Sequence, residues 1–150
     1  MTHPPARPYH LTAGRRLANA LLGGLVRTGV VPDSTQLVET VGRRTGAARS
    51  TPVRIVRLGG AEYLVAPYGA VAWVHNARAA GVVTLRHGRR ERRMLVREVG
   101  ADEAGRVLAR YVELAPTTRS SFAAAPGSPA SAFAAEAERH PVFALSPAAA

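Results

Sequence analysis

Residues 50–66 read STPVRIVRLGGAEYLVA and carry the clearest structural signal in the chain. Two apolar runs flank the pair Gly59 and Gly60, and Val53 and Ile55 in the first run are separated by Arg54. Alternation with a period of two is typical of a strand with one buried face. A Gly-Gly pair readily adopts the positive φ angles that a tight hairpin turn requires. The segment therefore predicts an antiparallel hairpin with strands at 50–58 and 62–66.

Further strands and helices are expected on both sides of this hairpin. A short apolar run at 37–41 ends at Gly42, a second hairpin is expected at 82–86 and 90–99 around His87-Gly88, and a last strand at 142–145. Helical spacing predicts helices at 11–28, 72–80, 102–114 and 132–139, with a loop at 117–131. Strands and helices do not alternate as in a doubly wound fold. We therefore expect an α+β protein with a mostly antiparallel sheet or barrel, an N-terminal helix, one inserted helix and C-terminal helices.

Length and composition limit the domain organisation and the chemistry. The 150 residues fit one domain, which we expect at 9–145 between a flexible arm at 1–8 and a flexible tail at 146–150. The absence of cysteine excludes thiol catalysis and cysteine metal sites, and the five histidines lack the spacing of metal ligands. No apolar run approaches the ~20 residues of a membrane span. We therefore expect a cytoplasmic protein without a bound metal.

The net charge of +10 comes entirely from arginine, since the chain has no lysine. This excess of base indicates a polyanionic partner. Nucleic acid is not expected, because the chain shows no groove-fitting element and aromatic residues make up only 5% of it. A run of arginines within 86–97 fits either a solvated hairpin or an electrostatic funnel for an anionic ligand.

The stretch GRRTGAARSTP at 42–52 is the first candidate site. Its glycines let backbone N–H groups approach an anion closely, and its arginines supply forked donors that match phosphate or carboxylate. The Gly-Lys-Ser/Thr ending of a P-loop is missing. A basic hairpin loop without a ligand would have the same composition.

The second candidate site combines VAPYGA at 65–70 with WVHNAR at 73–78. Here a strand is expected to end, the chain to turn at Gly69 and a helix to begin, which exposes backbone amides to an anionic or polarised ring edge. Trp73 could form the wall of a flat pocket or pack in the core.

Together these motifs, in this order and spacing, resemble the deazaflavin-dependent nitroreductase family, whose members include quinone and nitroimidazole reductases of actinobacteria. The resemblance covers about 37–99 and implies a split β-barrel that binds coenzyme F-420, a deazaflavin with a phosphodiester and an oligoglutamate tail. By position, it implies that Arg43, Arg44 and Thr45 meet the tail and that Arg49 meets the phosphate.

The resemblance also implies contacts with the deazaflavin ring. Beside the ring would run Ser50, Thr51, Pro52, Val53 and Arg54. Backbone contacts would come from Ala66, Pro67, Tyr68 and Gly69. The other side of the ring would be closed by Trp73, Val74, His75, Asn76 and Ala77. Tyr68 and His75 are the candidates to protonate the product.

The chain departs from the family where nitroreductases carry a Ser-Lys pair, since Pro67 and Tyr68 stand there. Thr118 and Phe122 also occupy the region of the pocket tyrosines. The implied activity is hydride transfer from reduced coenzyme F-420 to a small electron-poor acceptor: a quinone, an enone or a nitroaromatic. An FMN-binding split barrel and a non-catalytic cofactor- or lipid-binding barrel remain as alternatives.

Two further expectations concern partners. Leu17, Leu21, Leu22 and Leu25 form an apolar stripe on the first helix, with Arg15, Arg16 and Arg27 at its edges. Such a helix can lie on an anionic membrane surface, or its stripe can cap the barrel. The chain also allows a homodimer.

Overall fold

A computed structural model describes residues 13–29 and 32–149, and within the first helix the side chains from residue 19 onward. The arm expected at 1–8 lies outside the described residues. The described residues form six strands: β1 (Thr35–Val41), β2 (Ala48–Leu58), β3 (Ala61–Val65), β4 (Val82–His87), β5 (Arg90–Glu98) and β6 (Val142–Pro147). The helices are α1 (Ala13–Thr28), α2 (Ala72–Ala80), α3 (Ala101–Leu114) and α4 (Ala130–Ala134), with 3-10 turns at Pro116–Ser121 and Ala137–Arg139.

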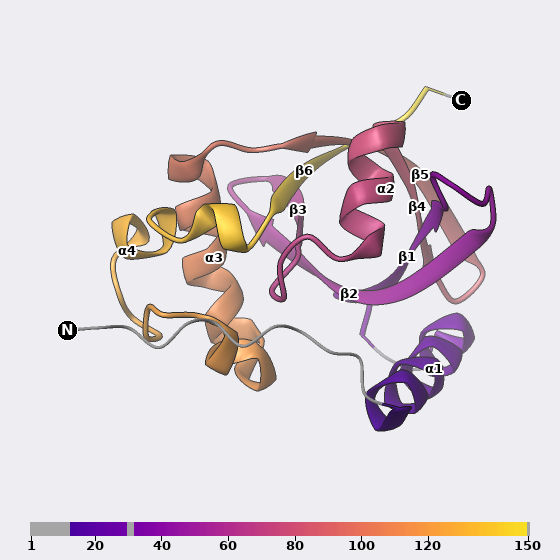
Figure 1. The fold of residues 1–150 in the computed structure, drawn as a ribbon, viewed down its shortest axis with the longest axis horizontal. Coiled ribbons are helices and arrows are strands. Elements are labelled where there is room, and N and C mark those ends of the chain that lie inside the picture. Colours follow the sequence, from indigo (N-terminus) through magenta and orange to yellow (C-terminus); the bar gives the residue numbers. More distant parts are fainter. Residues whose placement is uncertain (1–12, 30–31, 150) are drawn as a thin grey trace.

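The strands close into one barrel in the order β1-β2-β3-β6-β5-β4, and every neighbouring pair is antiparallel (Figure 1). The first predicted hairpin is β2–β3, where Leu58 pairs with Ala61 across Gly59 and Gly60, both at positive φ. The second is β4–β5. The expected α+β split barrel with an inserted helix is therefore confirmed.

Alternation along the strands divides the apolar residues between two cores. Inward-facing residues such as Val38, Ile55 and Leu85 fill the barrel, and α2 contributes Trp73 and Val74 to the same cluster. Trp73 lies 5.8 Å from Phe143, measured between ring centroids. The helix α2, set against the ring of strands in Figure 1, thus closes one end of the barrel interior.

The outer faces of β2, β3 and β6 form the second core with α3. Val56, Tyr63 and Val142 point outward from the strands and pack against Val107 and Leu108 of the helix. The helix α1 covers a different outer face, where it contacts β1, β2 and β4 and buries Val26. The strand β2 therefore contacts two helices, α1 and α3.

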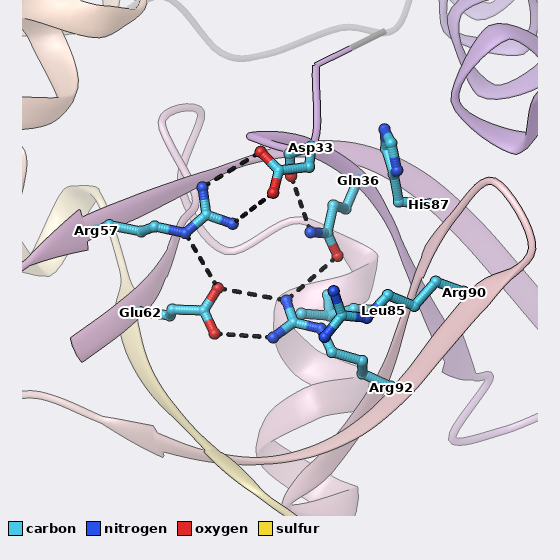
Figure 2. Close-up of a pocket in the computed structure, with 8 residues that line it drawn as sticks. All are labelled: Asp33, Gln36, Arg57, Glu62, Leu85, His87, Arg90 and Arg92. Carbon is cyan, nitrogen blue, oxygen red and sulfur yellow. Dashed lines mark hydrogen bonds and ion pairs between the residues drawn. The ribbon is translucent and has the colours of Figure 1, made fainter. Parts of the chain in front are cut away.

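The barrel end opposite α2 holds a polar network (Figure 2). Arg57 pairs with Asp33 and with Glu62, and Arg92 pairs with Glu62 at 2.8 Å and reaches Gln36. The hydrogen bond from Arg92 lowers the pKa of Glu62 despite its partial burial. These groups line a cavity of about 270 Å³. Ion pairs thus occupy this end, whereas an apolar helix closes the other.

The C-terminal region differs from the sequence prediction in three places. Part of the expected loop at 117–131 forms the 3-10 turn Pro116–Ser121, and the expected helix at 132–139 is divided into α4 and Ala137–Arg139. The last strand, expected at 142–145, extends to Pro147. Pro147 pairs with Met94, and the Ala148 N–H donates to the Arg93 carbonyl, because β5 offers a partner along this length.

The close approach of α3 and α4 predicts the effect of Gly105→Ala. A Cβ atom there would lie 2.5 Å from the Ala130 carbonyl oxygen and 2.9 Å from the Ala134 Cβ. We expect a loss of about 1–3 kcal/mol in the free energy of unfolding, as for overpacked cores. Chemical denaturation measures it. Gly24→Ala is the matched control, because no atom lies within 4 Å of its Cβ position in α1. A Gly105→Ala protein as stable as the Gly24→Ala protein would contradict the prediction.

Candidate functional site

The loop 42–47 between β1 and β2 is tightly hydrogen-bonded. The Gly42 N–H donates to the Ala47 carbonyl at 2.7 Å, and the Gly46 N–H donates to the Gly42 carbonyl at 2.8 Å. Gly46 has φ +71°, and a Cβ at Gly42 would come within 2.7 Å of the Thr45 hydroxyl oxygen. Both glycines are thus required by the shape of the loop, which presents its intervening side chains to solvent.

Asn76 of α2 joins this loop to the barrel. Its Oδ1 accepts from the N–H and from Nη1 of Arg43, both at 3.2 Å, and its Nδ2 donates to the Thr40 hydroxyl at 3.1 Å. Both Arg43 groups can only donate, so the orientation of the amide follows from its partners. Asn76 is 2% exposed and Thr40 is 6% exposed. A buried amide therefore connects the two sequence motifs. The order of the motifs along the chain did not reveal this connection.

The arginines of the first motif lack acidic partners. Arg43, Arg44 and Arg49 are exposed, and within residues 32–149 no carboxylate forms an ion pair with any of them. The ion pairs that carboxylates form with arginines in this part of the chain involve Arg57, Arg78, Arg86, Arg92, Arg97 and Arg110. Within the described residues, positive charge without an ion pair thus lies at the loop, as it also does at Arg89, Arg90 and Arg93 of the β4–β5 hairpin.

The next predicted residues lie on β2 and alternate between its two faces. Thr51 and the buried Val53 point into the barrel, whereas Ser50, Pro52 and Arg54 point outward. Arg27 of α1 donates to the Ser50 hydroxyl at 3.4 Å. The structure therefore divides the predicted stretch 50–54, and only its outward side chains lie on the surface between α1 and α3.

The segment 66–69 runs from β3 toward α2. The Ala66 N–H donates to the Pro141 carbonyl at 2.8 Å, and the Gly69 N–H donates to the Ala66 carbonyl at 3.3 Å. Gly69 has φ +92°, in the left-handed region that favours glycine. Pro67, Tyr68 and Gly69 are half-buried. The segment is thus a compact turn beside the residues before β6.

The predicted residues of α2 do not share one environment. Trp73, Val74 and Ala77 are buried in the barrel core, so their side chains pack against the protein itself. His75 is exposed on the opposite face of the helix. The two candidate proton donors therefore differ in exposure: Tyr68 is half-buried in the turn, whereas His75 is exposed to solvent.

Tyr68 lies near a second phenol. Burial raises the pKa of Tyr111, the Tyr68 phenol adds to this rise, and Arg54 opposes it. Tyr111 packs against Phe122, with ring centroids 6.0 Å apart, and Thr118 is buried close by. Thr118 and Phe122 thus lie close to Tyr111 at the outer core.

Sequence reasoning missed a buried ion pair beside the turn 66–69. His140 Nε2 lies 2.8 Å from Glu136 Oε1, and His140 Nδ1 lies 2.8 Å from the Pro67 carbonyl oxygen. Burial opposes ionisation of Glu136, but the N–H groups of Ala123 and Ala124 and the ring of His140 outweigh it and lower the pKa of this carboxyl. The i,i+4 spacing of Glu136 and His140 was the available signal.

The comparison with protein families decides the identity. The model of the family described as "F420H(2)-dependent quinone reductase" matches residues 14–124. The chain belongs to this family. As an F420H(2)-dependent quinone reductase family member it is an oxidoreductase that uses coenzyme F-420. No curated protein sequence matches the chain.

Solved structures with the same fold include relatives of this family and others. A protein described as an F420-H2 dependent reductase (FDR-A) is 20% identical, with 77% of this chain and 96% of that chain covered and a TM-score of 0.52. A domain-swapped dimer is 20% identical over 89% and 96%, with a TM-score of 0.54. The heme storage protein HutZ of Vibrio cholerae is 12% identical over 78% and 83%, with a TM-score of 0.52. Such low identities establish the barrel alone.

Other sequence expectations have plain outcomes. Among the hairpin arginines, Arg86, Arg92 and Arg97 form ion pairs with carboxylates, and the β4–β5 turn lies at the barrel end away from loop 42–47. No group of residues that could hold a metal ion occurs in the described part of the chain. No described helix is long and apolar enough to cross a membrane.

The hydrogen bonds that Asn76 forms with Arg43 and Thr40 predict the effect of Asn76→Ala on stability and on the loop 42–47. Without the amide, the Arg43 N–H and the Thr40 hydroxyl lose their partner, which costs about 1–3 kcal/mol of stability. Trypsin should then cleave faster after Arg43 and Arg44, as followed by mass spectrometry of timed digests. Asn19→Ala in α1 is the control. Cleavage of the loop at the same rate in both variants would show that Asn76 does not hold it.

Proposed function

We propose that the protein transfers a hydride from reduced coenzyme F-420 to a small electron-poor acceptor, with loop 42–47 and strand β2 as the cofactor site. The observation that carries this proposal is the loop's cluster of exposed arginines without acidic partners, clamped by Asn76 to the helix behind the turn 66–69. Membership of the family supplies the reaction type.

The arginine cluster fits the chemistry of the cofactor tail. Phosphodiester and carboxylate oxygens accept paired hydrogen bonds from guanidinium forks. Arg43, Arg44 and Thr45 at the tip would hold the oligoglutamate tail, and Arg49 at the start of β2 would hold the phosphate. FMN carries a single phosphate and would leave most of this positive charge unused.

The surface between α1 and α3 would take the ring. Outward-facing Ser50, Pro52 and Arg54 would flank it on β2, and the turn formed by Ala66, Pro67, Tyr68 and Gly69 would offer backbone groups to its polar edge. The buried side chains of Val53, Trp73, Val74 and Ala77 would support this surface from inside the barrel.

Reduced coenzyme F-420 supplies the hydride, and the residues of this chain orient the reactants and exclude water. A quinone, an enone or a nitroaromatic fits as the acceptor, because each is apolar and accepts a hydride at an electron-poor centre. Tyr68 is the better-placed proton donor because it is half-buried in the turn beside the proposed ring site. His75 is exposed, so water could protonate the product in its place.

Arg49→Ala tests this site directly. Loss of a charge-assisted contact costs roughly 1.5–3 kcal/mol, which corresponds to a dissociation constant for coenzyme F-420 about 10- to 150-fold higher. The control, Arg93→Ala on the outer face of β5, should stay within about 0.5 kcal/mol. Fluorescence titration with coenzyme F-420 and FMN measures both.

The wild-type protein should bind coenzyme F-420 more tightly than FMN. Longer glutamate tails should bind better at low salt, because the ~8 Å Debye length at physiological ionic strength shortens as salt is added. Equal affinity for FMN, or equal binding by the Arg49→Ala and Arg93→Ala proteins, would place the site elsewhere.

We further infer that α1 brings the protein to an anionic membrane surface, where apolar acceptors dissolve. Gly23 and Val26 face the barrel, but Leu21 and Leu25, one turn apart, are 63% and 48% exposed. The helix thus caps the barrel through Gly23 and Val26, which lie outside the expected stripe, whereas Leu21 and Leu25 of the stripe face outward. Leu17, Arg15 and Arg16 belong to the same expectation, and their side chains lie outside the described residues.

The membrane proposal predicts that the protein co-sediments with anionic but not with neutral liposomes. Leu21→Glu with Leu25→Glu should abolish this, because apolar burial and charge act together at an interface. Leu95→Glu on β5, where the side chain is 47% exposed, is the control. If wild-type protein pellets with neither liposome, the peripheral location is refuted.

A further inference from the structure

The buried pair Glu136 and His140 has no place in the proposed binding surface, yet its atoms reach the turn 66–69. Glu136 is 3% exposed and His140 is 4% exposed. Both nitrogens of the imidazole are engaged, one by the Glu136 carboxylate and one by the Pro67 carbonyl. A titratable pair buried so completely is costly unless each of its atoms is satisfied.

The carboxylate end of the pair is anchored to the loop after Pro116–Ser121. Glu136 Oε1 accepts the Ala123 N–H at 3.0 Å, and Oε2 accepts the Ala124 N–H at 2.9 Å. Phe122, just before these amides, stacks on the His140 ring with centroids 4.1 Å apart and planes 25° apart. The imidazole is therefore fixed in position by stacking and by hydrogen bonding.

The histidine end acts on the turn. A carbonyl oxygen only accepts hydrogen bonds, so His140 Nδ1 carries a proton toward Pro67. The Ala123 and Ala124 N–H groups stabilise the ionised form of Glu136, and its carboxylate accepts a hydrogen bond from Nε2–H in turn. A continuous series of contacts thus runs from the loop 122–124 through Glu136 and His140 to Pro67. It ends one residue before Tyr68.

We propose that Glu136 and His140 are positioning residues that fix the Pro67 carbonyl and so hold the backbone of the turn 66–69. The functional role of this positioning rests on the proposed function, which assigns the turn 66–69 to the deazaflavin ring. The contact itself is independent of any ligand. Through the same pair, the loop at 122–124 is coupled to the site.

Hydrogen exchange in the ligand-free protein tests the positioning role. His140→Phe keeps an aromatic ring against Phe122 but removes both N–H donors, and Glu136→Gln weakens the fixation of the imidazole. We expect amides of 68–71 to exchange about tenfold faster in His140→Phe, equivalent to about 1.4 kcal/mol of local opening. A smaller increase is expected in Glu136→Gln. Amides of β4 should stay unchanged, and Glu138→Gln, exposed on the next turn, is the matched control.

The double variant Glu136→Gln/His140→Phe separates positioning from stability. His140→Phe leaves a buried carboxylate without its partner, whereas the double variant removes both charges, so its melting temperature should recover. Exchange at 68–71 should nevertheless stay fast, because the Pro67 carbonyl still lacks its donor. Exchange that recovers together with the melting temperature would overturn the proposal. Equal acceleration in β4 and at 68–71 would overturn it as well.

A cofactor titration keeps this inference distinct from the proposed function. The variants should bind coenzyme F-420 more weakly than the wild type, while Glu138→Gln binds normally. If the wild-type protein does not bind the cofactor, the proposed function fails but the exchange data still decide whether the pair holds the turn. If the wild type binds it and exchange at 68–71 is unaffected by either substitution, only the positioning role is refuted.

Discussion

The side-chain amide of Asn76 is the interaction on which the arrangement of the site depends. It accepts two hydrogen bonds from Arg43 and donates one to Thr40, and it does so from a helix whose other residues close the barrel. A buried amide satisfied on both sides has one stable orientation. Packing of α2 in the barrel core therefore fixes the position of the basic loop, although the loop itself is exposed.

Ion pairs engage only part of the arginines of this protein of net charge +10, and Arg43, Arg44 and Arg49 are among the described arginines that have none. Carboxylates pair with Arg86 on β4 and with Arg97 on β5. At the polar barrel end Glu62 pairs with both Arg57 and Arg92 (Figure 2). No carboxylate forms an ion pair with Arg44 or Arg49 within the described residues. Unneutralised arginines attract a polyanion without first having to leave an internal partner.

The molecule holds the two sides of the candidate site by different means. Loop 42–47 is held by hydrogen bonds, one of them from the Arg43 guanidinium to Asn76, and by two glycines, so the Arg44 side chain and the other guanidinium donors of Arg43 remain available. The turn 66–69 is held by the buried pair of Glu136 and His140, which links it to the C-terminal loop. The first side is suited to a flexible charged tail, and the second is suited to a rigid ring.

The sequence by itself determined the barrel hairpins, the short helix α2 and the basic motif, because each depends on local signals: alternation on β2, the Gly-Gly turn, and Gly81 at positive φ after the helix. It also determined the family, since the motifs keep their order and spacing. It misjudged where β6 ends, because strand length depends on the partner strand β5. Only the tertiary structure decided that Trp73 packs in the core while His75 faces solvent, that Asn76 clamps Arg43, and that His140 reaches Pro67. These contacts join residues 33 and 73 positions apart, and closing such distances is a property of the packed chain that no local pattern records.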